Sequence, residues 1–222
     1  MSELLPVVIL ISGGGSNLQA IINASQTGEL PVDIRAVISN IDGAHGLVRA
    51  QEAGIPTEVI KHTDFASREG FDLALQNSID DHEPALIILA GFMRLLSDNF
   101  VNHYLGRMIN IHPSLLPKLK GLNTHQRALE EHRAGTLKEH GASVHFVTPD
   151  LDGGPVILQA SVPIKRDDTI ESLGARVLIR EHQIYPVVIR WFAEGRLGFK
   201  DNQAIFDGQI LEHGLSYDEL TS

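Results

Sequence analysis

Short apolar runs alternate with stretches of helical periodicity along the first part of the chain. Val7–Ile11 is a continuous, mostly β-branched run that stops at glycines, which is typical of a strand buried on both faces of a parallel sheet. Apolar side chains then recur at helical spacing over Leu18–Ile22, and Ser16 or Asn17 is expected to cap this helix. The chain therefore begins with a predicted strand, a glycine turn and a helix.

The same alternation continues to about residue 89. Strands are predicted at Ile34–Ile38, Thr57–Ile60 and Ala85–Leu89, and helices at Leu47–Ala53 and Ser67–Ile79. Because strands and helices alternate, the fold class is predicted to be α/β, with a mostly parallel, Rossmann-like sheet flanked by helices.

Beyond residue 107 the pattern becomes mixed. The predicted elements there are a short extended segment at Met108–Ile111, strands at Ala142–Val147 and Val156–Pro163, and a long amphipathic helix at Thr169–Ala193. A bend or break is expected in that helix near Pro186. Turn signals at Asp201-Asn202 and Asp207-Gly208 predict a small hairpin in the tail. The C-terminal part is thus predicted to add antiparallel strands to the parallel sheet.

Composition narrows the classes of protein and partner. The 222 residues carry a formal net charge of −10 and include no cysteine. Zero cysteines exclude disulfides, thiolate zinc sites, iron–sulfur clusters and cysteine nucleophiles. The acidic balance argues against a nucleic-acid partner held by general attraction to phosphate, so the expected partners are small molecules. No linker or repeat divides the chain, so residues 1–222 are predicted to form one domain, either as a monomer or as a homodimer.

Targeting signals are the next consideration. No apolar stretch reaches the roughly 20 residues that a membrane-spanning helix needs. The N-terminus has an acidic start and lacks the basic region of a signal peptide. We therefore expect a cytoplasmic protein without a membrane partner.

The glycine turn after the first strand, residues 12–17, is the first candidate site. Glycines allow a ligand to approach the backbone closely, and a helix N-terminus presents free N–H groups to an anion. The segment therefore predicts either a phosphate site or a tight strand-to-helix turn without a ligand. A dinucleotide site fits less well, because Leu18 stands where the fingerprint needs a third glycine and Asp33 precedes its strand.

Asn110 and His112 form the second candidate. In an extended strand, residues two apart point to the same face, and Pro113 favours the extended conformation at His112. A carboxamide beside an imidazole suits acyl transfer, because both groups can stabilise a developing oxyanion and the imidazole can move a proton. The alternative is a pair of polar residues satisfied at a strand end.

The third candidate is the turn that contains Asp152 and the glycines that follow it. Asp152 could orient His112 and keep it protonated, although Asp and Gly are also the residues of ordinary β-turns. His140 and His145 lie five residues apart, but without cysteine or an HExxH pattern no metal site is predicted. These histidines are interpreted as surface or core residues.

Five stretches resemble one known family, and they lie at residues 11–22, 89–97, 110–129, 143–160 and 180–197. Taken together and in this order, they are similar to the folate-dependent phosphoribosylglycinamide formyltransferases of purine biosynthesis. The resemblance covers about Val7 to Arg196.

The resemblance implies a set of site residues. The catalytic residues would be Asn110, His112 and Asp152. The ribonucleotide substrate would be bound by Gly15, Ser16, Asn17, Arg68 and Glu181. The folate would contact Met93, Arg94, Leu95, Leu96, Asn110, Val147 and Leu151. The N-terminal half would form mainly the ribonucleotide side and the C-terminal half the folate side.

The implied reaction is direct formyl transfer in a ternary complex. The amine of glycinamide ribonucleotide would attack the formyl carbon of the cosubstrate 10-formyltetrahydrofolate. Asn110 and protonated His112 would stabilise the oxyanion of the tetrahedral intermediate, and Asp152 would help to move a proton to the leaving nitrogen. Neither a metal nor a covalent enzyme intermediate is required.

The sequence departs from the family's commonest pattern at Asn123, where a histidine is frequent, and at Leu178, where some members have a polar residue. Formyltetrahydrofolate hydrolase and methionyl-tRNA formyltransferase share related catalytic patterns. Each carries an extra domain, for which we expect no counterpart in this chain. A catalytically silent folate or nucleotide binder is the remaining alternative.

Overall fold

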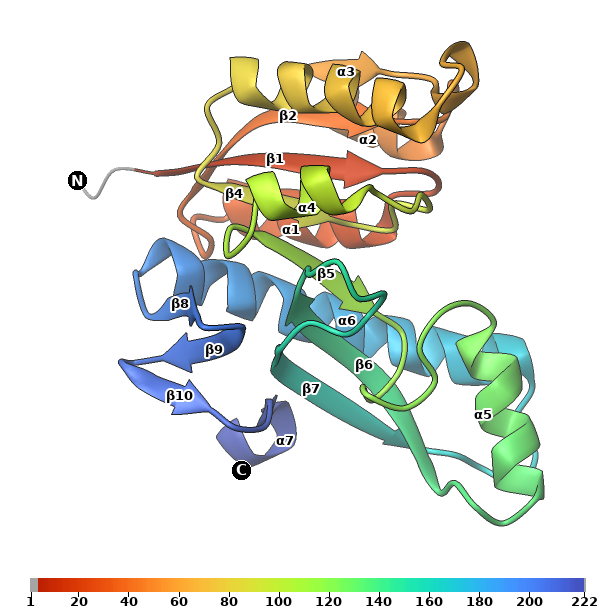
Figure 1. Cartoon of the computed structure of the whole chain (residues 1–222). Coiled ribbons are helices and arrows are strands. Elements are labelled where there is room, and N and C mark those ends of the chain that lie inside the picture. The colour runs from red at the N-terminus through yellow and green to blue at the C-terminus, as the bar shows by residue number, and fades with distance from the viewer. Residues whose placement is uncertain (1–3, 222) are drawn as a thin grey trace.

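The computed structural model describes residues 4–221 and consists of a central sheet with helices on both faces (Figure 1). Within these residues the main sheet has eight strands, in the spatial order β11 (Leu215–Ser216), β7 (Val156–Pro163), β6 (Glu139–Phe146), β5 (Met108–His112), β4 (Leu86–Leu89), β1 (Leu5–Ile11), β2 (Val32–Ser39) and β3 (Thr57–Val59). Strands β1 to β5 pair in parallel, whereas β6 is antiparallel to both β5 and β7. The predicted α/β class with a mostly parallel sheet is confirmed.

Helices cover both faces of this sheet. They are α1 (Ser16–Gln26), α2 (His45–Glu52), α3 (Arg68–Asp81), α4 (Asp98–His103), α5 (Thr124–Arg133), α6 (Ile170–Ala193) and α7 (Tyr217–Leu220), with a turn of 3-10 helix at His62–Asp64. Helices α1, α2, α5 and α6 contribute to one hydrophobic core, and α3 and α4 to the core on the opposite face.

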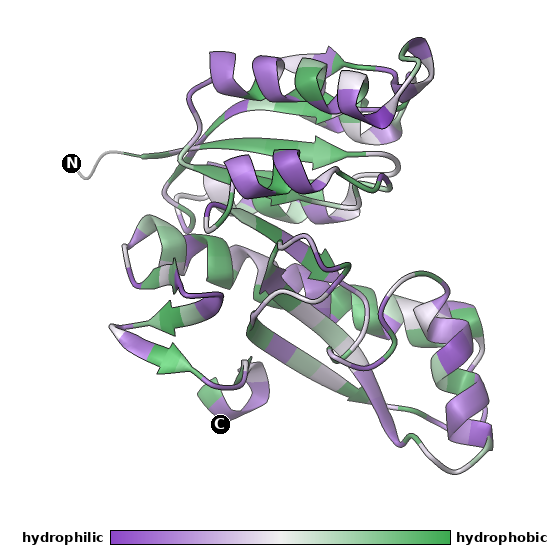
Figure 2. Cartoon of the chain, in the orientation of Figure 1, coloured by the Kyte–Doolittle hydropathy of each residue, from purple (hydrophilic) through white to green (hydrophobic). Residues whose placement is uncertain are grey.

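Strand β1 shows why the central strands read as continuous apolar runs. Its alternate residues Val7, Ile9 and Ile11 enter the core beneath α1 and α6, while Val8 and Leu10 enter the core beneath α3 and α4. Figure 2 shows β1 and β4 as hydrophobic along their length. Because both faces are covered, a polar residue at any of these positions would be buried without water.

The tail forms a small sheet of its own. Within the described residues it has three antiparallel strands, β8 (Leu197–Lys200), β9 (Gln203–Phe206) and β10 (Gln209–Leu211). Asp201 and Asn202 connect β8 to β9, and Asp207 and Gly208 connect β9 to β10, all four with positive φ. Two such residues in succession are the signature of two-residue hairpin turns. The predicted hairpin is confirmed and extended by one strand.

Two predictions about helices need correction. Helix α6 continues through Pro186 without a break, and Tyr185, Val188 and Ile189 on either side of the proline are buried in the core. Helix α1 is capped by Gly15 rather than by Ser16 or Asn17.

Helices α4 and α5 were not predicted. Helix α4 has only six residues, and α5 is mostly polar with Ala128 and Leu129 as its buried apolar residues. Neither pattern gives a clear apolar face in the sequence. Within residues 4–221, no helix combines the length and the hydrophobicity needed to cross a bilayer.

Candidate active site

The predicted site residues gather at the edge where the parallel strands end. Strands β1 and β4 are neighbours in the sheet, and the chain leaves β1 toward α1 on one face and β4 toward α4 on the other. Ser12, directly after β1, donates a hydrogen bond from Oγ to Asn40 Oδ1 at 2.5 Å and accepts one from the Met93 N–H at 2.7 Å. These bonds join the ends of β1, β2 and β4. The order of the strands reverses between β1 and β4, and ligands of open α/β sheets usually bind at such a point.

The glycine loop leaves the N-terminus of α1 open. Gly15 has φ 70°, and a Cβ on it would lie 2.6 Å from Gly46 Cα, so a larger residue would push α2 away from the loop. No side chain caps α1, and its first turn has no acidic residue. Arg49 supports the loop by donating a hydrogen bond from Nε to the Gly14 carbonyl at 2.8 Å. This arrangement can bind an anion through backbone N–H groups.

Asn17 and Glu181 meet beside this loop, although they lie on different helices. Asn17 Nδ2 donates a hydrogen bond to Glu181 Oε2 at 2.6 Å, and both residues are buried. Burial raises the pKa of the Glu181 carboxyl, and the Asn17 bond opposes this shift. Asn17 Oδ1 has no hydrogen-bond partner among the described residues, so it can accept a bond from an amine or hydroxyl of a ligand.

Asn110 and His112 project from the same face of β5, and Asp152 approaches them from the loop between β6 and β7. His112 Nδ1 lies 3.4 Å from Asp152 Oδ2, and His112 Nε2 lies 3.1 Å from the Leu119 carbonyl. Both neighbours are acceptors, so the ring can donate to both only as an imidazolium with a proton on each nitrogen. The structure therefore brings the three predicted catalytic residues together.

The loop after β5 folds back onto this group. Leu119, Gly121 and Asn123 all have positive φ, and Asn is one of the residues that tolerates that conformation. The fold-back brings the Leu119 carbonyl to His112, and it lets the Gly121 N–H donate a hydrogen bond to Asp152 Oδ2 at 2.9 Å. Asn123, one of the departures from the family pattern, is the N-cap residue of α5.

His145 belongs to the same group, although the sequence suggested only a surface or core histidine. It lies on β6 directly opposite Asn110, with Asn110 Nδ2 and His145 Nε2 3.2 Å apart. Its Nε2 is also 3.8 Å from Asp152 Oδ1. The sequence could have suggested this position only if the pairing register of β5 and β6 had been known.

Exposed apolar side chains lie in the loops that follow β4 and β6. Met93, Leu95 and Leu151 are each more than half exposed, which is unusual for large apolar residues in adjacent loops. Leu96 and Val147 are partly buried against the core beneath α3 and α4. The predicted folate-contact segments therefore combine exposed apolar side chains with others that pack against the core. Leu122 is also more than half exposed and was not predicted.

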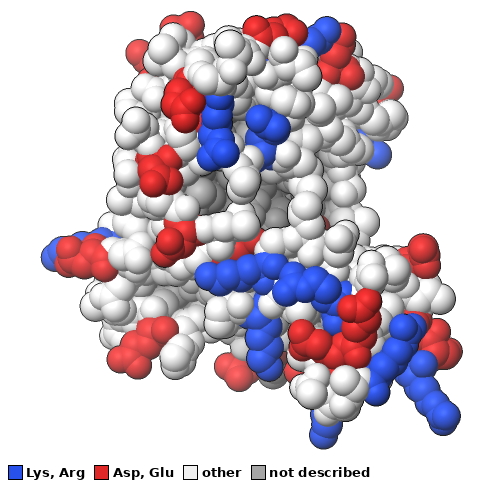
Figure 3. Space-filling model, turned by 45° about the vertical axis from the view of Figure 1, so that its right-hand side comes forward, with Lys and Arg blue, Asp and Glu red and all other residues white. Residues whose placement is uncertain are grey.

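Charge on this face differs from the net charge of the chain. Figure 3 shows Lys and Arg side chains on both sides of a hollow that crosses the face at which β1 and β4 end. Arg94 is exposed in the loop after β4, and Arg68 is exposed at the start of α3. Arg68 makes no described contact with the other predicted site residues, and Leu178 is half-buried on α6. The face can attract anions even though the protein is acidic.

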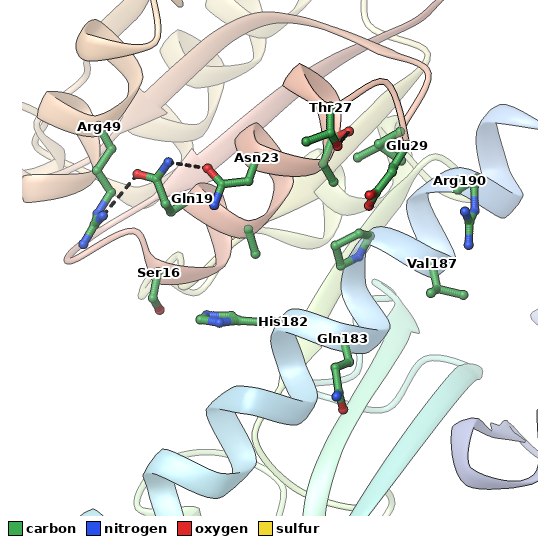
Figure 4. Close-up of a pocket in the computed structure, with 14 residues that line it drawn as sticks. Ser16, Gln19, Asn23, Thr27, Glu29, Arg49, His182, Gln183, Val187 and Arg190 are labelled. Atoms are coloured by element: carbon green, nitrogen blue, oxygen red, sulfur yellow. Dashed lines mark hydrogen bonds between the residues drawn. The ribbon is translucent and has the colours of Figure 1, made fainter. Parts of the chain in front are cut away.

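A cavity of about 590 Å³ continues from the glycine loop along the groove between α1 and α6. Of the predicted site residues, Ser16 alone lines it, and Figure 4 shows His182 beside Ser16. His182 Nε2 is buried without a hydrogen-bond partner among the described residues, and burial lowers the pKa of this ring. Within residues 4–221, no group of three or more His, Asp or Glu side chains is arranged to hold a metal ion.

Two buried histidines of β6 make the folded state sensitive to acid. Burial lowers the pKa of His140 and of His145 from 6.5 to about 4. The unfolded chain therefore takes up protons at both rings before the folded protein does. We expect the free energy of unfolding to be highest above pH 6.5 and to fall progressively between pH 6.5 and about 4.

Urea unfolding measured across this pH range tests the expectation. His140→Leu should reduce the slope of stability against pH, whereas the exposed control His213→Leu should leave the slope unchanged. A stability that is flat over this range would contradict the prediction.

Comparisons with known proteins identify the family of the chain. A model of the formyl transferase family matches residues 5–189. A phosphoribosylglycinamide formyltransferase of Escherichia coli is 54% identical over 214 residues, which cover 96% of this chain and 99% of that protein. The phosphoribosylglycinamide formyltransferase structure from Coxiella burnetii superposes with a TM-score of 0.90 at 57% identity, covering 96% of this chain and 100% of that one.

A formyltetrahydrofolate deformylase structure from Burkholderia mallei is more distant. Its TM-score is 0.81 at 27% identity, with 92% of this chain and 70% of that chain covered. The family match spans most of the sequence, and the similarity to the Escherichia coli relative extends over nearly the whole of both proteins. This chain belongs to the formyl transferase family, as an enzyme of its phosphoribosylglycinamide formyltransferase branch.

Proposed function

We propose that this enzyme transfers the formyl group of 10-formyltetrahydrofolate to the amine of glycinamide ribonucleotide in de novo purine biosynthesis. The observation that carries the proposal is the convergence of Asn110, His112 and Asp152 at the ends of the parallel strands. The similarity to phosphoribosylglycinamide formyltransferases supports the same reaction. We place the reaction in the cytoplasm, with small molecules as the partners.

The ribonucleotide would lie against the glycine loop. Backbone N–H groups of Gly15, Ser16 and Asn17 would hold the phosphate at the uncapped start of α1. Glu181 would bind the glycinamide end, since its carboxylate lies beside the unpartnered Asn17 Oδ1. In this proposal the ribonucleotide site draws on both halves of the chain, because α1 and α6 meet there.

The folate would lie across the apolar rim formed by Met93–Leu96 and by the loop with Val147 and Leu151. Exposed apolar side chains on a packed base suit an aromatic ring system, and the exposed Arg94 suits the carboxylates of its glutamate tail. When bound, 10-formyltetrahydrofolate supplies the formyl group.

Asn110, His112 and Asp152 would each have a separate role in the transfer. The ribonucleotide amine forms a bond to the formyl carbon, and negative charge develops on the formyl oxygen. Asn110 donates an N–H to that oxygen, and the His112 imidazolium stabilises its charge. Asp152 holds His112 charged and relays the amine proton through water to the leaving nitrogen, whose bond to carbon breaks. The products are formylated ribonucleotide and tetrahydrofolate.

An absorbance assay of formyl loss, with and without glycinamide ribonucleotide, tests the proposal. Turnover that depends on the ribonucleotide, together with formation of its formylated product, is the expected result. Formyl loss without the ribonucleotide would instead indicate a hydrolase. Folate binding without any turnover would indicate a silent binder.

Arg68→Ala tests the electrostatic part of the proposal. We expect the KM for the ribonucleotide to rise by roughly tenfold with little change in kcat, because one charge-assisted contact to the substrate is lost. The dependence of KM on salt should weaken as well. Arg133→Ala removes an exposed arginine from the end of α5 and serves as the control. An Arg68→Ala enzyme with unchanged KM and unchanged salt dependence would remove Arg68 from the substrate site.

A further inference from the structure

His145 has no role in the formyl transfer proposed for Asn110, His112 and Asp152. Its side chain is almost completely buried on β6, in direct register with Asn110 across the β5–β6 pair. Side chains of directly opposite residues in antiparallel strands lie close together on one face. The contacts of the two ring nitrogens determine what this histidine can do.

The protonation pattern of the ring follows from these contacts. Nδ1 lies 2.9 Å from the Phe146 carbonyl, which can only accept, so Nδ1 carries a proton. Burial holds the pKa of the ring at about 4, so the ring is neutral near pH 7. Asp152 works against this shift, while His112 and Lys120 reinforce it. Nε2 is therefore an unprotonated acceptor.

This tautomer determines how the Asn110 amide is oriented. An unprotonated Nε2 accepts a hydrogen bond from the Asn110 NH₂ group, 3.2 Å away. If the amide were flipped, its carbonyl oxygen would face the lone pair of Nε2, and the interaction would be repulsive. One amide hydrogen is thus bound to His145, and the second remains available on the half-buried Asn110 side chain.

The same tautomer affects Asp152. Its Oδ1 lies 3.8 Å from His145 Nε2, and it receives no hydrogen bond from a nitrogen that carries no proton. Asp152 Oδ2 faces His112 and accepts from Gly121, so Oδ1 remains the oxygen that is available for proton relay.

We propose that His145 is a positioning residue for formyl transfer: as a neutral acceptor it holds the Asn110 carboxamide with an N–H directed at the formyl oxygen. The inference rests on the proposed function. His145 does not touch the reacting atoms, and it acts through Asn110.

A double-mutant cycle between His145 and Asn110 tests this role. His145→Leu should lower kcat roughly tenfold or more, with the KM of both substrates little changed. A misoriented amide stabilises the transition state less well but leaves substrate binding unaffected. In an Asn110→Ala background the same substitution should cost little further kcat, because the amide that it orients is absent. His145→Gln should restore most of the activity, since its side-chain oxygen can replace Nε2 as the acceptor.

His140→Leu is the matched control. His140 is a second buried histidine on β6 whose pKa is also lowered to about 4 by burial, and it contacts His125 instead of Asn110. The factors by which His140→Leu and Asn110→Ala lower kcat should multiply in the double mutant. The proposal would be overturned if the losses of kcat from His145→Leu and Asn110→Ala also multiplied. It would equally be overturned if a folded His145→Gln enzyme were no more active than His145→Leu.

A measurement that is independent of activity separates this inference from the proposed function. Nitrogen-15 NMR of the wild-type protein reports the tautomer of His145 directly. We expect a protonated Nδ1 and an unprotonated Nε2 at neutral pH. A protonated Nε2 would overturn the role of His145 even if the enzyme transfers formyl groups and even if His145→Leu fails to fold. Ribonucleotide-independent formyl loss in the wild type would instead refute the proposed function.

Discussion

Replacing His112 by alanine is expected to lower turnover by about 10²–10³-fold while the protein remains folded. His112 places its ring on the same face of β5 as Asn110, and both of its nitrogens face oxygen acceptors. In the proposed mechanism this ring carries the positive charge that stabilises the developing oxyanion, and the substitution removes it. The loss of one such donor typically raises the barrier by about 3–4 kcal/mol.

The fold should survive this change because the partners of His112 keep other contacts. Asp152 still accepts a hydrogen bond from the Gly121 N–H, and β5 remains paired on both sides. Asn110→Ala should cost a similar factor in turnover, because the amide N–H is the second oxyanion donor of the proposed mechanism.

Steady-state kinetics with both substrates, together with urea unfolding of each variant, measures the effect. His103→Ala is the control, because His103 is a half-exposed residue of α4 paired with Asp80 and lies outside the site. A folded His112→Ala protein with turnover close to that of the wild type would exclude the proposed mechanism.

Gly154→Ala is expected to give the largest loss of stability among single-methyl changes at the site. A Cβ on Gly154 would lie 1.9 Å from the Phe146 carbonyl oxygen and 2.9 Å from its carbon. Both atoms belong to the backbone of β6, so no flexible side chain can move aside. We expect unfolding to be easier by about 3 kcal/mol, which corresponds to a decrease in Tm of roughly 6–12 °C for a chain of this size.

This substitution should also reduce activity. Gly154 follows Asp152 by two residues in the loop between β6 and β7, and His145 precedes Phe146 on β6. Displacing the Phe146 backbone would shift both side chains away from His112 and Asn110.

Gly198→Ala in β8 is the matched control for stability. A Cβ there would meet only Ile205 Cβ at 3.8 Å, an ordinary contact distance. Thermal unfolding of both variants measures the difference. If Gly154→Ala were as stable as Gly198→Ala, the close approach of β6 to this glycine would not describe the protein in solution.

Much of the fold follows from local pattern. The continuous apolar run Val7–Ile11 identified a strand buried on both faces, and the alternation of strands and helices identified the α/β class. A strand places residues two apart on one face, so the shared face of Asn110 and His112 on β5 was also predictable. Short or polar elements such as α4 and α5 lacked such a pattern and were missed.

The sequence by itself determined the class of fold, the glycine turn before α1 and the shared face of Asn110 and His112, because each depends on local backbone periodicity. The tertiary structure alone decided which distant side chains meet. Asp152 reaches His112, Asn17 reaches Glu181, and His145 lies opposite Asn110. These contacts depend on strand register and helix packing. Both are set by the free energy of the whole core, and neither can be read from local sequence spacing.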